Sequence, residues 1–260
     1  MGKMMKYLKQ YQILCGFFLT ICLLRLWGGS LLPAGLEVEK EKAVSSFVEA
    51  GQEEMAVEAE VMEKEAAEKT GKMQRDLPPK IALTFDDGPS KYTKRLSEGL
   101  KKRGVSATFF LLGENIEKYP EAVTKLAKDG HLLGNHSYSH GQLNQMSQKK
   151  ACGEIARTNN QIYECTGEYP QYVRPPFGEC NEQLDCGVEM IPIFWNLDSL
   201  DWKVKNTEKI VQMVTEQVQE GSIILMHDGY ETSVEAAFQI VDMLQKKGYE
   251  FVTADQMVLD

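Results

Sequence analysis

The chain has 260 residues and a net charge of −9, and hydrophobic residues make up 43% of it. This composition is that of an ordinary globular protein, and it excludes a fully disordered or a collagen-like chain. The acidic balance argues against general nucleic-acid binding, which relies on Lys and Arg to displace the counterions of phosphates.

Charge is distributed unevenly along the chain and divides it into three zones. Residues 1–36 carry four basic residues and no acidic one. Residues 37–76 carry 12 acidic and 6 basic residues, and the remaining residues carry 26 acidic and 19 basic residues. We therefore expect three parts, at residues 1–35, 36–77 and 78–260.

The first zone has the pattern of a membrane signal. Three lysines precede an apolar run, and between residues 13 and 27 only Thr20 and Arg25 are polar. The stretch from Leu8 to Leu32 is long enough to cross about 30 Å of hydrocarbon. The positive-inside rule places the lysine-rich end in the cytoplasm. We expect a retained single-pass anchor in the cell membrane, with the rest of the chain outside the cell.

Two alternatives to the anchor stay open. A cleaved signal peptide would make the protein secreted, and small residues that suit a cleavage site occur at 28–30 and 33–35, although neither forms a convincing Ala-x-Ala motif. A buried helix of a soluble domain is the second alternative, and the apolar residues on all sides of the segment disfavour it.

The second zone is rich in Glu, Ala, Lys, Val and Met. Such a stretch has helical propensity but too little apolar surface to build a core of its own. Its apolar residues do not keep a heptad, which disfavours a coiled-coil stalk. We expect a charged, solvated extracellular linker.

The third zone alternates short apolar strands with amphipathic helices. Strands are expected at residues 81–85, 107–112, 131–135, 172–174, 191–197, 222–226 and 250–253, and helices at 92–103, 116–130, 148–165, 207–219 and 234–247. Repeated strand–helix units predict an α/β fold with a parallel sheet and helices outside, and periodicity alone does not decide between an open sheet and a barrel.

Polar segments follow five of the expected strands. In parallel α/β folds the loops after the carboxyl ends of the strands meet at the ligand. The segments are Thr-Phe-Asp-Asp-Gly-Pro-Ser at 84–90, His-Ser-Tyr-Ser-His at 136–140, Arg-Pro-Pro-Phe-Gly at 174–178, Asp-Ser-Leu-Asp-Trp at 198–202 and Leu-Met-His-Asp at 225–228.

Two of these segments together predict a metal site. His136 and His140 have the i, i+4 spacing that places two imidazoles on one side of a helical turn. Asp86 and Asp87 end a strand, where one carboxylate can bind a metal while the other turns toward a substrate. Two histidines and one carboxylate leave coordination positions open, as a catalytic metal site requires. The ordinary alternatives are solvated loop histidines and an Asp-Gly turn or helix cap.

Cysteine usage is compatible with an exported domain. Cys152, Cys165, Cys180 and Cys186 allow one or two disulfides in an oxidising compartment, and the sequence does not choose among the pairings. None has zinc-ribbon spacing. His131 begins an expected strand, and we interpret it as a structural residue.

From about Lys80 to Val258 the chain resembles the polysaccharide deacetylases of carbohydrate esterase family four, with all five segments in the order of that family. The resemblance implies a distorted (β/α) barrel, usually of seven strands, here preceded by one membrane helix and a charged linker. It also implies one divalent metal ion, with zinc expected first and cobalt, nickel or manganese as alternatives.

The resemblance assigns the first three motifs to the base and to the metal. Asp86 corresponds to the catalytic base, and Arg174 to the residue that orients the base. The metal ligands correspond to Asp87, His136 and His140.

The remaining motifs correspond to the acid and to the substrate pocket. His227 matches the general acid, and Asp201 matches the aspartate that holds its imidazole. The backbone N–H of Phe177, where the family often has Tyr, is expected to bind the oxyanion. Trp202 and Leu225 are expected to form an apolar wall for the acetyl methyl group, and plain core packing is the alternative for both.

The implied reaction is metal-assisted hydrolysis of an N-acetyl group, first of all on N-acetylglucosamine of peptidoglycan. Relatives that act on N-acetylmuramic acid often lack the second aspartate of the first motif, and Asp87 is present here. The alternatives are O-deacetylation of xylan or another glycan, deacetylation of chitin oligomers, an inactive glycan-binding module, and a tethered structural protein. We expect a monomer whose partners are a cell-wall glycan and the membrane, without nucleic acid.

Overall fold

The computed structural model describes residues 60–65, 77–179, 186 and 190–258. The chain divides into two units, Met1–Asp76 and Leu77–Asp260. Residues 60–65 of the first unit are helical and exposed. The expected membrane segment and most of the expected linker lie outside the described residues. No helix within the described part of the chain is both long and apolar enough to span a bilayer.

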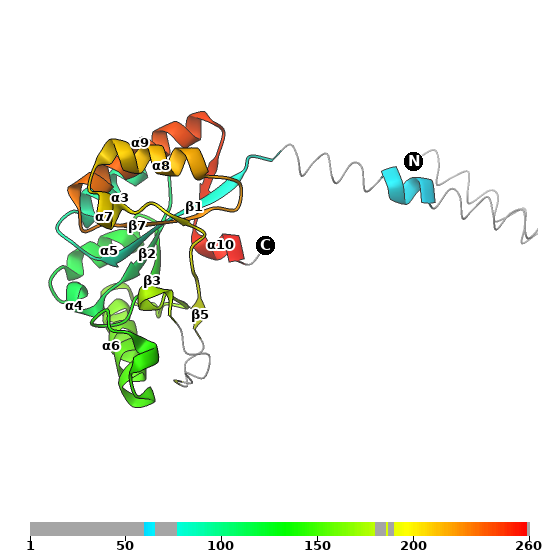
Figure 1. Cartoon of the computed structure of the whole chain (residues 1–260). Helices are drawn as coiled ribbons and strands as arrows, with labels where there is room; N and C mark the ends of the chain where they lie inside the picture. The colour runs from blue at the N-terminus through cyan, green and yellow to red at the C-terminus, as the bar shows by residue number, and fades with distance from the viewer. Residues whose placement is uncertain (1–59, 66–76, 180–185, 187–189, 259–260) are drawn as a thin grey trace, which may run out of the picture. The chain divides into compact units, whose positions relative to one another are not determined.

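The second unit is built on a parallel sheet (Figure 1). Seven strands follow the order β5-β4-β3-β2-β1-β7-β6, and β8 pairs with the first residues of β1. All of these pairings are parallel. The strands are β1 (Lys80–Gly88), β2 (Thr108–Leu111), β3 (Leu132–Asn135), β4 (Tyr172–Val173), β5 (Ile191–Pro192), β6 (Leu197–Asp198), β7 (Ile223–His227) and β8 (Glu250–Val252).

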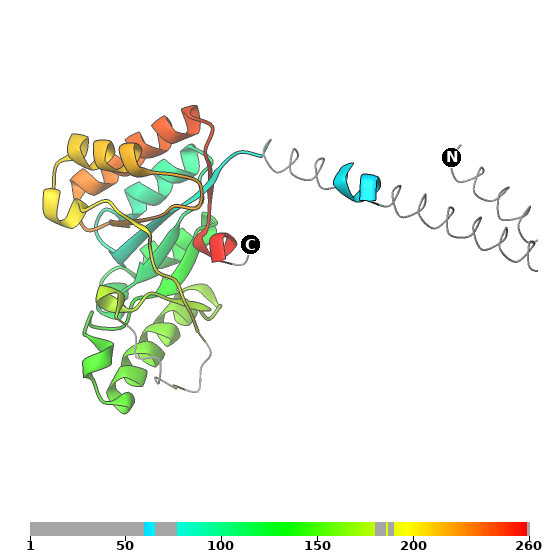
Figure 2. The ribbon, with the colours of Figure 1, turned by 45° about the vertical axis from the view of Figure 1, so that its right-hand side comes forward.

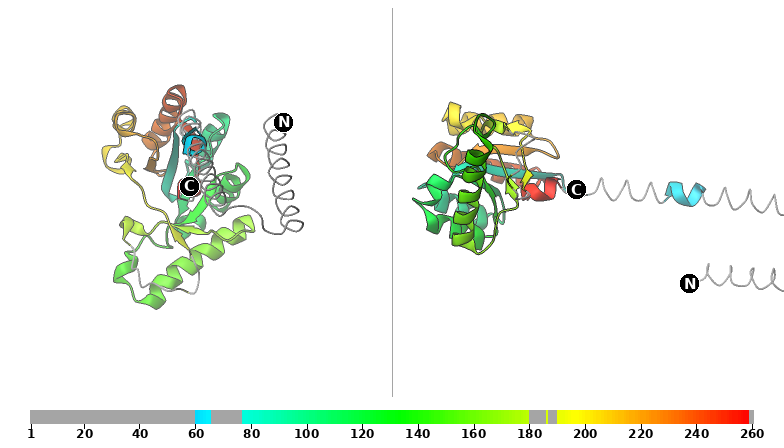
Figure 3. Two further views of the ribbon diagram at one scale, coloured as in Figure 1. Left: turned by 90° about the vertical axis from the view of Figure 1, so that its right-hand side faces the viewer. Right: turned by 90° about the horizontal axis from the view of Figure 1, so that it is seen from below.

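The longer helices cover the outside of this sheet as one layer (Figures 2 and 3). The contacts run from α6 through α5, α3 and α9 to α8, so the helices follow the curvature of the strands. The helices are α3 (Thr93–Lys102), α4 (Gly113–Ile116), α5 (Pro120–Lys128), α6 (Gln148–Thr166), α7 (Asp201–Val204), α8 (Thr207–Gln217), α9 (Glu231–Lys246) and α10 (Ala254–Val258), with the 3₁₀ turns η1 (Leu143–Gln145) and η2 (Pro176–Gly178).

The sheet is a seven-stranded half-barrel, which agrees in part with the distorted seven-stranded barrel that we expected. Its edge strands, β5 and β6, are not paired with each other among the described residues. The prediction of one strand over residues 191–197 is wrong, because this range holds two separate strands, β5 and the start of β6. Ile193 still pairs with β4, because its N–H donates to the carbonyl oxygen of Val173. Three residues later the chain pairs with β7, where the N–H of Asn196 donates to the carbonyl oxygen of Ile223.

Side chains of β1 alternate between two faces of the sheet, as period-2 geometry requires. Ile81, Leu83 and Phe85 are fully buried in the main core beneath the helices. Ala82 belongs to a smaller cluster with Phe110 on the inner, concave face. Positions 84 and 86 therefore face inward as well, and this places the polar end of β1 on the concave side.

Two further predictions are corrected. The helix expected over residues 116–130 is shorter and begins at Pro120 as α5, because proline lacks the N–H that a continuous helix needs and suits the first turn of a helix. The short helices α4, α7 and α10 were not predicted. A turn of four or five residues carries too little periodicity to be recognised in a sequence.

The structure also places the remaining histidine and two of the cysteines. His131 is buried beside β3, and its Nδ1 accepts a hydrogen bond from the backbone N–H of Ala107. Burial lowers the pKa of His131 to about 4, so the imidazole is neutral at pH 7, in agreement with a structural role. A disulfide joins Cys152 to Cys186, while Cys165 is a free, half-buried thiol. Cys180 lies outside the described residues.

Candidate active site

The two carboxylates at the end of β1 face the same side. Asp87 has a φ of +67°, in the left-handed region, so the strand's alternation of faces ends there. The Nε2 atom of His136 lies 3.7 Å from Oδ2 of Asp86 and 3.6 Å from Oδ1 of Asp87. Adjacent residues that would diverge along an extended strand thus meet at one imidazole.

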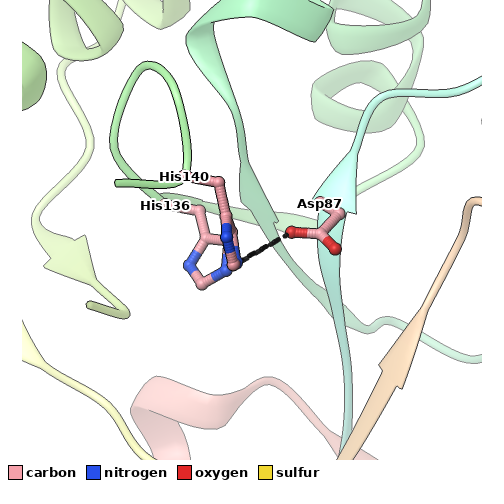
Figure 4. Close-up of side chains that lie close together, drawn as sticks. All are labelled: Asp87, His136 and His140. Atoms are coloured by element: carbon pink, nitrogen blue, oxygen red, sulfur yellow. Dashed lines mark ion pairs between the residues drawn. The ribbon is translucent and has the colours of Figure 1, made fainter. Parts of the chain in front are cut away.

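Asp87, His136 and His140 form the candidate metal site (Figure 4). Their ligand atoms lie within 4.8 Å of one another, and Nε2 of His140 is 3.4 Å from Oδ1 of Asp87. Figure 4 shows the carboxylate at the end of β1 turned toward both imidazoles. Imidazole nitrogen and carboxylate oxygen are ligands that suit a divalent transition metal.

The surroundings of these three residues fit a bound cation. Oδ1 of Asp87 is buried and has no hydrogen-bond partner among the residues that the structure describes, which is a costly arrangement unless a cation satisfies the oxygen. Nδ1 of His136 lies 2.6 Å from the carbonyl oxygen of Arg174. That contact places the proton of the neutral imidazole on Nδ1 and leaves the Nε2 lone pair for a metal. Burial lowers the pKa of His140, against the opposing charge of Asp87, and so favours the neutral, ligating form.

The two histidines converge from a loop after β3 and not from a helical turn. Ser137 and His140 both have positive φ angles, of 67° and 56°, so the helical geometry behind the spacing argument is wrong. The two rings nevertheless lie 5.1 Å apart. The loop is held by α4, where Gly113 donates its N–H to the Ser137 carbonyl, and by α6, where Glu154 accepts two hydrogen bonds from Ser139.

Arg174 fixes the position of Asp86 at the centre of the concave face. The guanidinium is fully buried, and its Nη1 donates to Oδ1 of Asp86 at 2.8 Å and to the hydroxyl of Thr84 at 2.8 Å. Its other nitrogens donate to the carbonyl oxygens of Ile193 and Phe194. A guanidinium held at four points cannot rotate away, so it orients the Asp86 carboxylate rigidly.

His227 lies beside Asp86 on the neighbouring strand and is paired with Asp201. The register of β1 and β7 places Asp86 opposite His227. Oδ1 of Asp201 is 2.8 Å from Nδ1 of His227, and Oδ2 accepts the His227 backbone N–H at 2.8 Å. Burial lowers the pKa of His227, but the hydrogen bond and charge of Asp201, together with the carboxylates on β1, raise it to about 9. At neutral pH this imidazole is protonated and can donate a proton.

Three apolar residues lie around these polar groups. Phe177 has a positive φ of 62°, and its exposed ring contacts His140 edge-on, with the centroids 4.7 Å apart. Trp202 lies on α7 and is 47% exposed. Leu225 is buried and pairs with Thr84 on the strand register, which places it on the concave face. Their contact with an acetyl group stays a prediction.

The sequence reasoning missed residues that support the site. Asn115 donates its amide N–H to the carbonyl oxygen of Asp87 at 2.7 Å. Asn135 accepts the N–H of Ser137 and donates to Asn159. Asn115 belongs to another segment of the chain, and Asn135 ends β3 directly before His136; the residue type of neither signals a role at a metal site.

Residues 74–190 match the family model of polysaccharide deacetylases. Peptidoglycan-N-acetylmuramic acid deacetylase PdaC of Bacillus subtilis is 42% identical over 68% of this chain and 38% of its own length. Peptidoglycan-N-acetylglucosamine deacetylase PgdA of Listeria monocytogenes is 36% identical over the same shares. A peptidoglycan-N-acetylglucosamine deacetylase of Bacillus cereus is 39% identical over 68% of this chain and 67% of its own length. The chain therefore spans less than half the length of PdaC and PgdA.

Solved structures of similar proteins also match the fold of this chain. The structure of PdaC has a TM-score of 0.67 and 41% identity, and covers 69% of this chain and 90% of the solved one. A family 4 carbohydrate esterase from Streptomyces lividans, solved in complex with acetate, has a TM-score of 0.62 and 35% identity over 66% of this chain and 90% of its own.

Proposed function

Because the chain belongs to the polysaccharide deacetylase family, we propose that it is a metal-dependent hydrolase that removes N-acetyl groups from peptidoglycan. One observation carries this proposal. The candidate metal site lies beside a carboxylate held by a buried arginine and beside a protonated, aspartate-paired histidine. A glycan-binding module has no need for such an acid and base set.

Asp87, His136 and His140 hold the cation in this proposal, and zinc is the ion that we assign to it. When bound, a divalent cation supplies Lewis acidity, which polarises the acetyl carbonyl and makes a water molecule easier to deprotonate.

Asp86 acts as the general base. Its Oδ1 is engaged by Arg174, while Oδ2 faces His136 of the metal site. Asp86 accepts a proton from the attacking water, and the fixed guanidinium keeps the carboxylate in its position during the transfer. The backbone N–H of Phe177 stabilises the negative charge that develops on the carbonyl oxygen.

His227 acts as the general acid. It protonates the amine as the bond between the carbonyl carbon and nitrogen breaks, because an amine is a poor leaving group without a proton. Asp201 keeps the imidazole charged and binds its Nδ1, which leaves the Nε2 proton for transfer. Acid and base therefore reach the same carbonyl from two neighbouring strands.

We expect the Asp201→Asn variant to lose activity first at alkaline pH. The protonated fraction of His227 falls as the pH rises through its pKa of about 9. Burial lowers that pKa and the Asp201 carboxylate raises it, so an amide at position 201 leaves burial dominant and moves the pKa down. The alkaline limb of the pH profile of kcat/KM should therefore move to lower pH, and this move should be smaller on an activated ester than on an amide. A limb at the wild-type position would contradict the acid assignment.

N-acetylglucosamine of peptidoglycan is the substrate that we propose. The relatives named above include deacetylases of both N-acetylglucosamine and N-acetylmuramic acid, so similarity to them does not choose between the two sugars, and the presence of Asp87 is what supports N-acetylglucosamine. Peptidoglycan treated with the enzyme can be digested with a muramidase, and mass spectrometry then locates the new amine. The proposal expects free amines on glucosamine and no acetate from acetylated xylan. Amines on muramic acid alone would contradict it.

We also propose that the first 35 residues anchor a monomeric enzyme in the cell membrane, with residues 78–260 as the catalytic domain outside. The basic and apolar pattern of the first zone supports this topology. The full chain should fractionate with membranes, and a chain that begins at Leu77 should be soluble and active. Recovery of a mature protein that begins near Ser30 or Gly35 would instead establish secretion.

A further inference from the structure

Asp228 is a buried acid that the proposed reaction does not use. It follows His227 at the end of β7 and is 0% exposed. One of its carboxylate oxygens, Oδ1, has no hydrogen-bond partner within the described residues. A fully buried carboxyl group is costly to desolvate, so its contacts with the rest of the site need an explanation.

Those contacts all lead to the turn that follows Asp87. The hydroxyl of Thr93 donates a short hydrogen bond to Oδ2 of Asp228. The same hydroxyl accepts the backbone N–H of Ser90 at 2.6 Å. The hydroxyl of Ser90 in turn donates to the backbone carbonyl of Asp228 at 2.8 Å. The residue after the proposed acid is therefore tied to the residues after the proposed metal ligand.

The same carboxylate restricts which residue fits at position 88. A Cβ atom at this position would lie 2.8 Å from Oδ2 of Asp228, closer than such atoms approach. Gly88 is not among the residues with positive φ, so its backbone is open to other residue types. The glycine is needed because Asp228 fills the space beside it.

The turn is supported on its opposite side by β2 and α4. The N–H of Leu112 donates to the carbonyl of Gly88 at 2.8 Å, and the side chain of Asn115 donates to the carbonyl of Asp87. Asp228 supplies the support on the β7 side. The turn that carries Asp87 is thus held on two sides.

We infer that Asp228 is a positioning residue for the metal ligand Asp87, which it holds by bracing the turn through Thr93, Ser90 and Gly88. It touches neither substrate nor metal in this account. The inference rests on the proposed metal site, and it adds a residue that fixes the spacing between the ligand on β1 and the acid on β7.

The test is the equilibrium zinc affinity of the full chain, measured by competition with a chromogenic chelator. Removal of an outer-shell partner weakens metal binding by about 10–100-fold, and Asp228→Ala should fall in that range. Asp228→Asn keeps an oxygen that accepts from Thr93, so it should stay within about threefold of wild type. Asp255→Ala is the matched control, because it removes a carboxylate on α10, after β8, one oxygen of which has no partner in the described part of the chain.

A second pair of variants distinguishes positioning from general stability. Gly88→Ala should weaken zinc binding in the wild-type background, since its Cβ collides with Asp228. In the Asp228→Ala background the same substitution should have little further effect, because the colliding atom is gone. A merely destabilising role for Asp228 predicts instead that Asp228→Ala lowers the melting temperature and leaves the zinc affinity of the folded protein at the wild-type value.

Two results would overturn the inference. If the Asp228→Ala variant binds zinc as tightly as wild type, the inference is wrong and the proposed function stays intact. The same holds if Gly88→Ala weakens zinc binding equally in the wild-type and Asp228→Ala backgrounds. A wild-type chain without zinc affinity would overturn both proposals. If Asp228→Ala fails to fold, Thr93→Val replaces it, with the same expected loss and the same contradicting result.

Discussion

The Asp86→Asn variant should bind zinc almost as well as wild type and lose most of its turnover. The amide has the shape of the carboxylate but cannot accept the proton of water. General bases contribute about 10²–10⁴-fold, so kcat should fall at least by that range. Because Arg174 is fully buried, the loss of its counter-charge should also lower the melting temperature, which is to be measured alongside acetate release per bound zinc.

Asp242→Asn is the matched control for this experiment. Asp242 lies on α9 and pairs with Arg103, so the substitution changes the same chemical group, also paired with an arginine, outside the site. Its turnover should stay at the wild-type value. An Asp86→Asn enzyme with unchanged turnover would show that another group takes the proton.

Removal of both His136 and His140 should abolish zinc binding and hydrolysis together. Asp87 alone cannot hold a divalent ion tightly, because structural and catalytic zinc sites use at least three protein ligands. Each single alanine variant should weaken zinc binding by more than about 100-fold, which is the largest effect expected from removal of an outer-shell partner. Of the two, His140→Ala is the cleaner variant, since removal of His136 also leaves the Arg174 carbonyl without its partner.

His227→Ala provides the contrast for the ligand variants. It should retain zinc, because His227 is not part of the cluster of Asp87, His136 and His140, and yet it should lose turnover on amide substrates. Zinc content after dialysis is measured by mass spectrometry for all variants. Stoichiometric zinc in the double variant would rule out this cluster as the metal site.

The order of strands and helices could be predicted from the sequence because local periodicity encodes it. The half-barrel could not, because the apolar run from 191 to 197 looks like one strand until the long-range partners of Ile193 and Asn196 divide it. The start of α5 at Pro120 has a sequence signal, because proline favours the first turn of a helix, whereas the expected helix began at residue 116. Local signals thus located the elements, and tertiary pairing decided where the sheet ends.

The candidate site was predictable as a set of strand-end motifs but not in its detailed geometry. Parallel topology brings the ends of β1, β3 and β7 together, which explains why Asp87, His136 and His227 could be grouped. The left-handed backbone at Asp87 and His140 was not predicted, because Asp and His adopt this conformation more readily than most residues but only at a minority of their positions. Supports such as Asn115 come from distant segments, and only the structure reveals them. The expected anchor and linker lie largely outside the described residues and stay predictions.

The most direct test of the central claim is acetate release from N-acetylglucosamine oligomers and from peptidoglycan by the full chain. The assay is run on zinc-loaded enzyme, after removal of metal by a chelator, and after zinc is restored. A metal-dependent N-deacetylase releases acetate in the first state, none in the second, and again in the third. Acetate release that survives complete removal of metal would contradict the metal-dependent mechanism, and no release from either glycan would contradict the deacetylase function.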